Sequence, residues 1–379
     1  MRRSEPRHAP IVPAYGSGTL AELADSLLAS VGGPGRNPLH LPRVRRACLL
    51  LVDGLGWELL RDHPAAAPFL SELAMNAGPL SAGFPATTST SLTTLGTGLP
   101  PGQHGMLGYR VAVPGENRLL NTLRWDERLD PARWQPHPTI YERAAAAGIG
   151  AYHVASRSFR NSGLTRAAMR GAAYRPADGI GALAAEAAAA AGEPGPLLVT
   201  AYHGDLDATG HTFGAGSDAW YYQLAHVDKL AEQLAGALPS GSALYVTGDH
   251  GMVDVAPEDR IDFDALPALR EGVALLGGDS RARHVYAHEG AAADVVAAWR
   301  ETLGSRAWVL SRDEAVKEGW FGPVEPAMAA RIGDVVAAAA GGCAIVATET
   351  EPRESALIGL HGSLASSDQL VPMLTLSIG

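Results

Sequence analysis

The sequence has few cysteines, no long apolar run and a deficit of positive charge. Its two cysteines, Cys48 and Cys343, define neither a disulfide framework nor a cysteine zinc site. No apolar run approaches the roughly 18 residues that a membrane-spanning helix needs, so we expect no membrane association. The formal net charge of -10 argues against a nucleic-acid polymer as the main partner. A small anionic substrate stays possible, because bound metal ions can dominate the local field.

The remaining composition is that of an ordinary core-forming protein. The chain has 379 residues, of which 46% are hydrophobic, enough for one large α/β domain with an inserted subdomain or for two domains. Residues 1–17 look irregular. The stretch Met1–His8 leads into no apolar signal core, so we expect a cytoplasmic protein. The sequence leaves the oligomeric state open.

Three short apolar runs without polar alternation predict strands buried on both faces, as in a parallel sheet. They lie at residues 49–52, 196–202 and 242–247. Helical patterns separate them, and the chain closes with a strand at 370–378. Helices are predicted at 19–31, 56–62, 66–75, 139–147, 179–191 and 217–237. The sequence therefore predicts an α/β fold with a mostly parallel central sheet between helical layers.

The pattern of buried strands followed by acidic and histidine residues ends after Val255. Between residues 266 and 341 no Asp/His cluster directly follows a buried strand. We therefore expect residues 1–254 to form the first part of a catalytic core, 255–345 an inserted α+β cap, and 346–379 the rest of the core. Arg281, Arg283 and His284 of this segment are expected on the solvated surface, with a contact to a substrate anion as the alternative.

Acidic and histidine residues follow each buried run, on the edge where α/β proteins build their sites. They are Asp53 after the first run, Asp207 and His211 after the second, Asp249 and His250 after the third, and His361 in the tail. Carboxylate oxygen and imidazole nitrogen suit Zn²⁺, and six ligands would supply two ions with three each. Two such ions form a clamp for displacement at phosphorus. The alternative for Asp53 is a simple cap on the following helix.

A hydroxyl-rich segment offers a nucleophile for such a site. Seven Thr and Ser residues stand between Thr87 and Thr94, where a helix is expected to begin. A helix N-terminus supplies positive potential and free N–H groups for phosphate oxygens. A metal or a base can activate a Thr hydroxyl, but composition does not select one Thr from the segment.

These motifs together resemble the alkaline phosphatase superfamily, and within it the nucleotide pyrophosphatase/phosphodiesterase (type I phosphodiesterase) family. The resemblance rests on Leu-Val-Asp-Gly at 51–54, Phe-Pro-Ala-Thr-Thr at 84–88, Thr-Gly-Leu-Pro-Pro-Gly-Gln-His-Gly at 97–105, Asp-x-x-x-His at 207–211, Gly-Asp-His-Gly at 248–251 and His-Gly at 361–362. It implies an alkaline-phosphatase-like three-layer sandwich and a two-zinc hydrolase of phosphodiester or pyrophosphate bonds in small phosphorylated substrates.

The resemblance also implies a role for each motif residue. Asp53, Asp249 and His250 are implied as ligands of one zinc ion. Asp207, His211 and His361 are implied as ligands of the other. The family's Phe-Pro-x-x-Thr arrangement selects Thr88 as the nucleophile, with its oxygen bridging the two ions and a phospho-threonine intermediate.

Two departures from the family pattern leave the substrate open. Residues 89–91 are Ser-Thr-Ser where these phosphodiesterases usually carry Phe-Pro-Asn, and Tyr109 stands where many carry a phosphate-holding Asn. Tyr109 or Arg110 could take over that phosphate contact, and an exposed loop pair is the alternative. Hydrolysis of phosphonates or phosphomonoesters on the same scaffold is a second candidate function. An inactive, metal-stabilised binding protein is a third.

Overall fold

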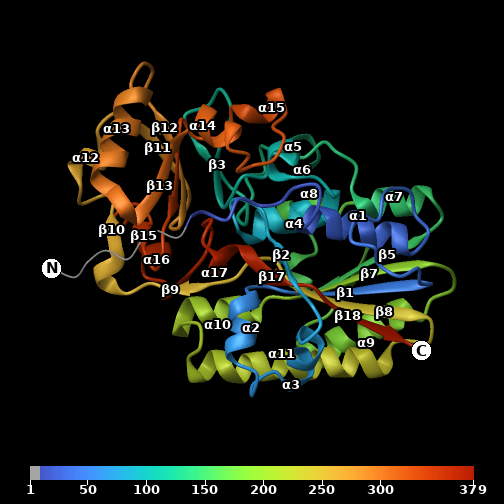
Figure 1. Cartoon of the computed structure of the whole chain (residues 1–379). Helices are drawn as coiled ribbons and strands as arrows, with labels where there is room; N and C mark the ends of the chain where they lie inside the picture. The colour runs from blue at the N-terminus through green and yellow to red at the C-terminus, as the bar shows by residue number, and fades with distance from the viewer. Residues whose placement is uncertain (1–8) are drawn as a thin grey trace.

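A six-stranded sheet with helices on both faces forms the centre of the molecule (Figure 1). The computed structural model describes residues 9–379. The sequence predictions for residues 1–8, including the absence of a signal core, lie outside this range. The predicted fold class is confirmed, since five of the six central strands run parallel.

The central sheet has the strand order β18-β8-β1-β7-β5-β6. Its strands are β1 (Arg46–Val52), β5 (Gly150–Ala155), β6 (Ala173–Pro176), β7 (Leu197–His203), β8 (Ser242–Gly248) and the antiparallel β18 (Leu374–Ile378). Val52 lies opposite His203 on one side and Gly248 on the other. The three strands predicted to carry ligands are thus neighbours that end at the same level.

Alternate residues of β1 enter two hydrophobic cores, because side chains of a strand point to opposite faces. Leu49 and Leu51 pack with α1, α4, α7 and α8, whereas Leu50 and Val52 pack with α2, α3, α9 and α11. These helices are α1 (Leu20–Ser30), α2 (Trp57–Asp62), α3 (Pro68–Ala74), α4 (Thr88–Thr97), α7 (Ile140–Ala146), α8 (Gly163–Ala168), α9 (Ile180–Ala191) and α11 (Asp218–Ala237). Figure 1 shows the two groups above and below the sheet.

A second sheet of four antiparallel strands lies beside the first, at the left of Figure 1. It contains β11 (Val273–Asp279), β12 (Ala282–Ala287), β13 (Ala307–Ser311) and β14 (Val335–Ala339), covered on one face by α12 (Pro267–Arg270) and α13 (Ala292–Leu303). The other face joins the main core, where Phe84 packs edge-on against Trp320. The second sheet therefore shares its packing with the large sheet.

Short elements complete the described chain. The strands are β2 (Pro79–Ser81), β3 (Arg110–Ala112), β4 (Leu119–Asn121), β9 (Val253–Asp254), β10 (Arg260–Asp262), β15 (Ala344–Val346), β16 (Gly359–Leu360) and β17 (Leu370–Pro372). The α-helices are α5 (Pro101–His104), α6 (Pro131–Trp134), α10 (Asp205–Phe213), α14 (Arg312–Lys317), α15 (Pro326–Ala329), α16 (Pro352–Ser355) and α17 (Ser366–Gln369). The 3₁₀ turns are η1 (Arg157–Phe159), η2 (Pro257–Asp259) and η3 (Gly304–Arg306).

The predicted surface position of Arg281, Arg283 and His284 is wrong. All three side chains are fully buried. The guanidinium of Arg281 forms a two-pronged pair with Asp368, at 2.8 and 2.9 Å, and Arg283 lies 2.8 Å from Glu351. Asp368 and Glu351 lie far along the chain from these arginines, so no local sequence pattern predicts the two ion pairs. These pairs connect β12 and the residue just before it to the C-terminal part of the chain.

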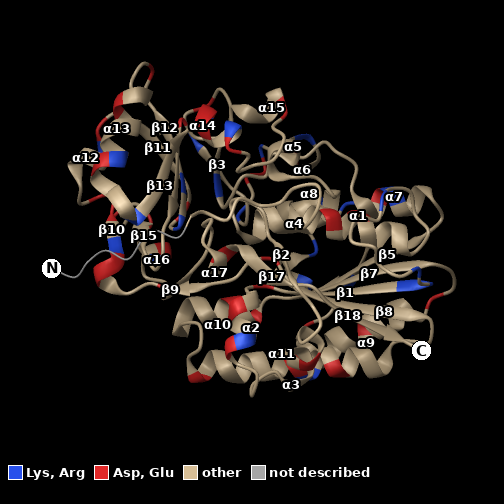
Figure 2. Cartoon of the chain, viewed as in Figure 1, with Lys and Arg blue, Asp and Glu red and all other residues tan. Residues whose placement is uncertain are grey.

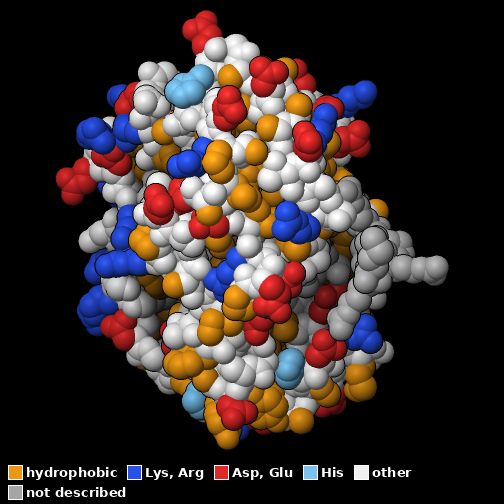
Figure 3. All heavy atoms as spheres, turned by 90° about the vertical axis from the view of Figure 1, so that its left-hand side faces the viewer, with side chains coloured by type: hydrophobic (Ala, Val, Ile, Leu, Met, Phe, Trp, Pro, Cys, Tyr) orange, Lys and Arg blue, Asp and Glu red, His pale blue; other side chains and the backbone are white. Residues whose placement is uncertain are grey.

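The distribution of charge agrees with this packing. Arg46 is the one residue of β1, β7 and β8 that is Lys, Arg, Asp or Glu, and Figure 2 shows these strands almost entirely in tan. On the face drawn in Figure 3, acidic and basic side chains are interspersed with hydrophobic ones. Among residues 9–379, no helix combines the length and the apolar character needed to cross a bilayer.

Candidate active site

The predicted ligands gather at the carboxyl ends of β1, β7 and β8. Asp53 directly follows β1, and its main-chain N–H donates to the carbonyl of His203 at 2.9 Å. Asp53 does not cap α2, whose N-cap is Gly56 without a side-chain bond. Asp249 and His250 follow β8 in a tight turn. The Asp53 carboxylate therefore does not bind the α2 backbone and can face His250 and the other predicted ligands.

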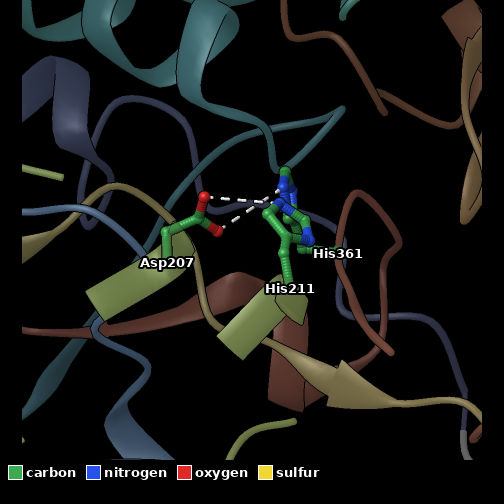
Figure 4. Close-up of side chains that lie close together, drawn as sticks. All are labelled: Asp207, His211 and His361. Atoms are coloured by element: carbon green, nitrogen blue, oxygen red, sulfur yellow. Dashed lines mark ion pairs between the residues drawn. The ribbon is translucent and has the colours of Figure 1, made fainter. Parts of the chain in front are cut away.

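Asp207, His211 and His361 form one compact group (Figure 4). Asp207 and His211 lie one turn apart on α10, as their spacing predicts, and His211 Nε2 is 3.3 Å from Asp207 Oδ2. His361 comes from the loop after β16 and places its Nε2 3.9 Å from Asp207 Oδ1. One potential ligand atom from each residue lies within 4.8 Å of the others.

A second group adjoins the first. Asp53, Asp207 and His250 also offer ligand atoms within 4.8 Å of one another, so Asp207 belongs to both groups. His250 Nε2 is 3.3 Å from Asp53 Oδ1 and 3.5 Å from Asp249 Oδ2. The family resemblance implies Asp249 as the third ligand of this group, but the compact cluster contains Asp207 as its third member. Asp249 lies next to the cluster.

The three histidines share one arrangement of their ring nitrogens. Each Nδ1 lies within hydrogen-bond distance of a main-chain carbonyl oxygen: His211 with Gly359 at 2.6 Å, His250 with Gly251 at 2.9 Å, and His361 with Ala86 at 2.9 Å. A carbonyl only accepts, so each Nδ1 carries a proton and each Nε2 is directed at the carboxylates. This is the orientation that a metal-binding histidine requires. Although burial opposes the shift, the neighbouring Asp249 and Asp53 raise the pKa of His250 to about 10, so without a metal its Nε2 also carries a proton.

Three carboxyl groups, Asp53, Asp207 and Asp249, surround these Nε2 atoms in a largely buried site. Burial and the neighbouring Asp53 raise the pKa of Asp249 to about 7, and they raise the pKa of Asp207 well above its ordinary value. Burial also holds the pKa of His361 well below its ordinary value. Asp207 Oδ1 and Asp249 Oδ2 have no hydrogen-bond partner among the described residues. Carboxyl oxygens without a partner that lie beside imidazole nitrogens in a buried site fit divalent cations.

Thr88 is the first residue of α4, and its hydroxyl lies inside the second group. Thr88 Oγ1 is 3.3 Å from His250 Nε2 and 3.4 and 3.5 Å from the oxygens of Asp53. Thr87 makes no side-chain capping bond. The first N–H groups of a helix have no intrahelical acceptor, so those of α4 remain available beside the hydroxyl.

Tyr109 and Arg110 lie at the rim of the site but already have acidic partners. The Tyr109 hydroxyl donates to Glu354 at 3.0 Å, and Arg110 pairs with Glu351 at 3.0 Å and with Glu354 at 3.4 Å. Sequence reasoning missed both glutamates, because they stand some 240 residues away and follow no ligand-like motif. The phosphate contact proposed for Tyr109 or Arg110 stays a prediction.

Two cavities meet at Thr88. One has a volume of about 240 Å³ and is lined by His211, His361, Asp279, Glu351 and Glu354. The other, of about 490 Å³, has largely apolar walls that include Leu92, Phe159, Leu164, Leu183 and Tyr202. Thr88, Leu123 and Asp207 line both. Tyr202 was also missed from sequence; its hydroxyl donates to Asp53, and its place at the end of β7 was the available signal.

Fold and site together define an α/β protein of the alkaline phosphatase superfamily with a candidate metal centre beside a helix-initiating threonine. The chain belongs to the type I phosphodiesterase/nucleotide pyrophosphatase family, whose model matches residues 47–364. The family resemblance inferred from the motifs is thereby confirmed. Membership indicates a hydrolase of phosphoric esters. No curated protein matches the sequence.

Solved structures with the same fold include two kinds of protein. Murine ectonucleotide pyrophosphatase/phosphodiesterase 5, an inactive variant in complex with AMP, has a TM-score of 0.68 and 20% identity, covering 86% of this chain and 87% of that one. The human protein gives 0.67 and 21%, covering 87% of both chains. Phosphonoacetate hydrolase from Sinorhizobium meliloti 1021, in complex with phosphonoformate, gives 0.69 and 19%, covering 92% of this chain and 93% of that one.

Proposed function

We propose that the protein is a two-metal hydrolase, with Zn²⁺ as the metal, that cleaves phosphodiester or pyrophosphate bonds through a phospho-threonine intermediate. The observation that carries this proposal is the common orientation of His211, His250 and His361. Each Nδ1 is held by a main-chain carbonyl, and each Nε2 is directed at the carboxylates beside Thr88 Oγ1. When bound, the two ions would supply Lewis acidity at the phosphorus oxygens.

The ligand assignment follows the two groups. Asp207, His211 and His361 would hold one ion, and Asp53, Asp249 and His250 the other. The free oxygens of Asp207 and Asp249 support these roles, because a buried acceptor without a partner is costly unless a cation satisfies it. Zn²⁺ fits the mixed carboxylate and imidazole donor set.

In the first step, Thr88 Oγ1 attacks phosphorus, and the bond from phosphorus to the leaving oxygen breaks. The Thr88 proton leaves as the new bond forms, with the Asp53 carboxylate next to Oγ1 to accept it. N–H groups at the start of α4 hold the phosphoryl oxygens as charge develops. In the second step, a water oxygen attacks phosphorus, the bond from phosphorus to the Thr88 oxygen breaks, and the proton held by Asp53 returns to that oxygen. One water proton stays with the oxygen now bonded to phosphorus, and the other passes through solvent to the first leaving group.

A diester is favoured over a monoester by the two cavities at Thr88. A diester carries two organic groups on one phosphorus atom, and the two cavities that Thr88 lines could each receive one of them. A monoester needs only one. The apolar walls of the 490 Å³ cavity suit an aromatic or alkyl group, since burial of such surface stabilises the complex.

The test compares an aryl phosphodiester, an aryl phosphomonoester and phosphonoacetate as substrates of the zinc-loaded protein. We expect the diester to be cleaved fastest. Preferential cleavage of the monoester or phosphonoacetate would favour the second candidate function. Inertness toward all three with metal fully bound would favour the inactive binding protein.

The nucleophile is tested separately with Thr88→Ala and Thr88→Ser. Thr88→Ala removes the attacking oxygen and should lower kcat by at least about 10³-fold. Thr88→Ser keeps a hydroxyl and should retain measurable turnover. Full activity in Thr88→Ala would overturn the assignment of Thr88.

A further inference from the structure

We infer that Ser91 is a positioning residue that holds the Asp249–His250 turn against the nucleophile helix. This inference rests on the proposed function, in which that turn carries two metal ligands. Ser91 stands three residues after Thr88 on α4. Residues three apart lie on the same side of a helix, so both hydroxyls face the turn after β8.

The contact is short and fully buried. Ser91 Oγ donates to the main-chain carbonyl of Asp249 at 2.6 Å, and both residues are inaccessible to solvent. One turn earlier, Thr88 Oγ1 faces Asp53 and His250. The helix therefore presents one hydroxyl to the ligand side chains and another to the backbone that carries them.

The side chain of Asp249 also stabilises this turn through its own hydrogen bonds. Its Oδ1 accepts from the N–H of Gly54 and from its own neighbour His250, each at 3.0 Å. This leaves Oδ2 free and fixes the direction in which it points. Among the described residues, Ser91 is the donor to the Asp249 carbonyl. Without it a buried acceptor would lack a partner and the turn could shift to find one.

Other hydroxyls of α4 serve as an internal comparison. Thr93 Oγ1 donates to the Ser89 carbonyl at 2.8 Å, a bond within the helix. Thr93 is as deeply buried as Ser91 but makes this bond to its own helix and not to the turn. Loss of the Thr93 hydroxyl should therefore affect packing without affecting the metal ligands.

The experiment measures zinc affinity of the full chain by chelator competition for wild type, Ser91→Ala and Thr93→Val. We expect Ser91→Ala to bind one of the two zinc ions about tenfold more weakly and the other unchanged. Thr93→Val should bind both as wild type does. Thermal unfolding of the three metal-free proteins measures general loss of packing, and kcat should fall in Ser91→Ala with little change in KM.

Ser91→Thr keeps the donor and should retain wild-type zinc affinity, which keeps the inference testable if Ser91→Ala does not fold. Wild-type affinity for both ions in a folded Ser91→Ala, or equal weakening in Ser91→Ala and Ser91→Thr, would overturn the inference. If the wild-type protein itself binds no zinc, the proposed function fails instead, so the two failures are distinguishable.

Discussion

At the scale of the residue, Asp249 shows that the stability of the site depends on a bound cation. Its carboxylate is buried beside Asp53, which is why its pKa is raised to about 7. A carboxyl whose folded pKa lies above its unfolded value contributes stability that is complete below its ordinary pKa of 3.8, and this contribution is lost as pH rises from there to about 7. Above pH 7 the metal-free site therefore holds a charge that it accommodates poorly.

Asp249→Asn should have opposite effects on the metal-free and metal-loaded proteins. At pH 8 we expect the metal-free variant to be more stable than wild type by about 1–3 kcal/mol, because a buried charge is gone. The loaded variant should bind zinc more weakly and lose activity, because an amide is a poor zinc ligand. Urea unfolding with and without chelator measures both. Destabilisation of the metal-free variant would contradict this account.

At the scale of elements, the site exists because tight glycine turns let three segments meet. A Cβ at Gly251 would lie 1.9 Å from the main-chain oxygen of Ser367 and 3.3 Å from the Cα of Gly56. Gly251 itself donates to the Asp368 carbonyl at 2.9 Å. The turn after β8 thus packs closely between the start of α2 and α17, and a side chain at position 251 would clash with the main chain.

Gly251→Ala should destabilise the protein by about 1–3 kcal/mol or more, because the added methyl group would clash with the main-chain oxygen of Ser367. A main-chain oxygen cannot move aside as a flexible side chain can. The displaced turn should also weaken zinc binding. Gly236→Ala is the control, because Gly236 lies in α11 with open space around it, and alanine there should raise stability by about 0.5–1 kcal/mol. Urea denaturation measures both. Equal stability of Gly251→Ala and wild type would show that the turn can relax.

The elements also show what sequence can and cannot predict. The strands ending at Val52, His203 and Gly248 are predictable because unbroken apolar runs lead straight into polar residues, and the helix through Asp207 and His211 follows from their spacing. Short α5 was not predicted, because Pro101 at its first turn starts it and Gly105 ends it after four residues, too few for a periodic pattern. Helix α8 and strand β6 were not predicted.

Contacts between distant segments were beyond prediction. The partner of Arg281 is 87 residues away and that of Arg110 is 241 residues away, and nothing near either arginine marks it as buried or paired. Composition treats both as surface cations. Only the tertiary packing of α17, which carries Asp368, and of the start of α16, where Glu351 lies, brings these partners to the two arginines.

At the scale of the whole molecule, three buried histidines that are not among the proposed metal ligands make the fold sensitive to acid. Burial lowers the pKa of His104 to about 3, of His153 to about 4 and of His284 to about 3. Each stays neutral when folded but takes up a proton near pH 6.5 when unfolded. Their contribution to stability is therefore complete above pH 6.5 and falls as pH drops from 6.5 toward 4.

We expect the free energy of unfolding of the metal-free protein to fall by up to about 4 kcal/mol per pH unit in this range from the three histidines together. His104→Asn should remove about a third of that slope while its side-chain oxygen can replace Nδ1 as acceptor for the Met106 N–H. Urea unfolding at pH 5, 6 and 7 measures the slope. An unchanged slope in His104→Asn would contradict the buried, neutral state.

The most direct test of the central claim is the covalent state of Thr88 during turnover. The zinc-loaded protein is mixed with an aryl phosphodiester, quenched in acid within the first turnover, digested and analysed by mass spectrometry. The account predicts a phosphoryl adduct, still carrying one aryl ester, on the peptide that contains Thr88, and none in Thr88→Ala. Rapid hydrolysis with no adduct on that peptide, or an adduct on another residue, would contradict it.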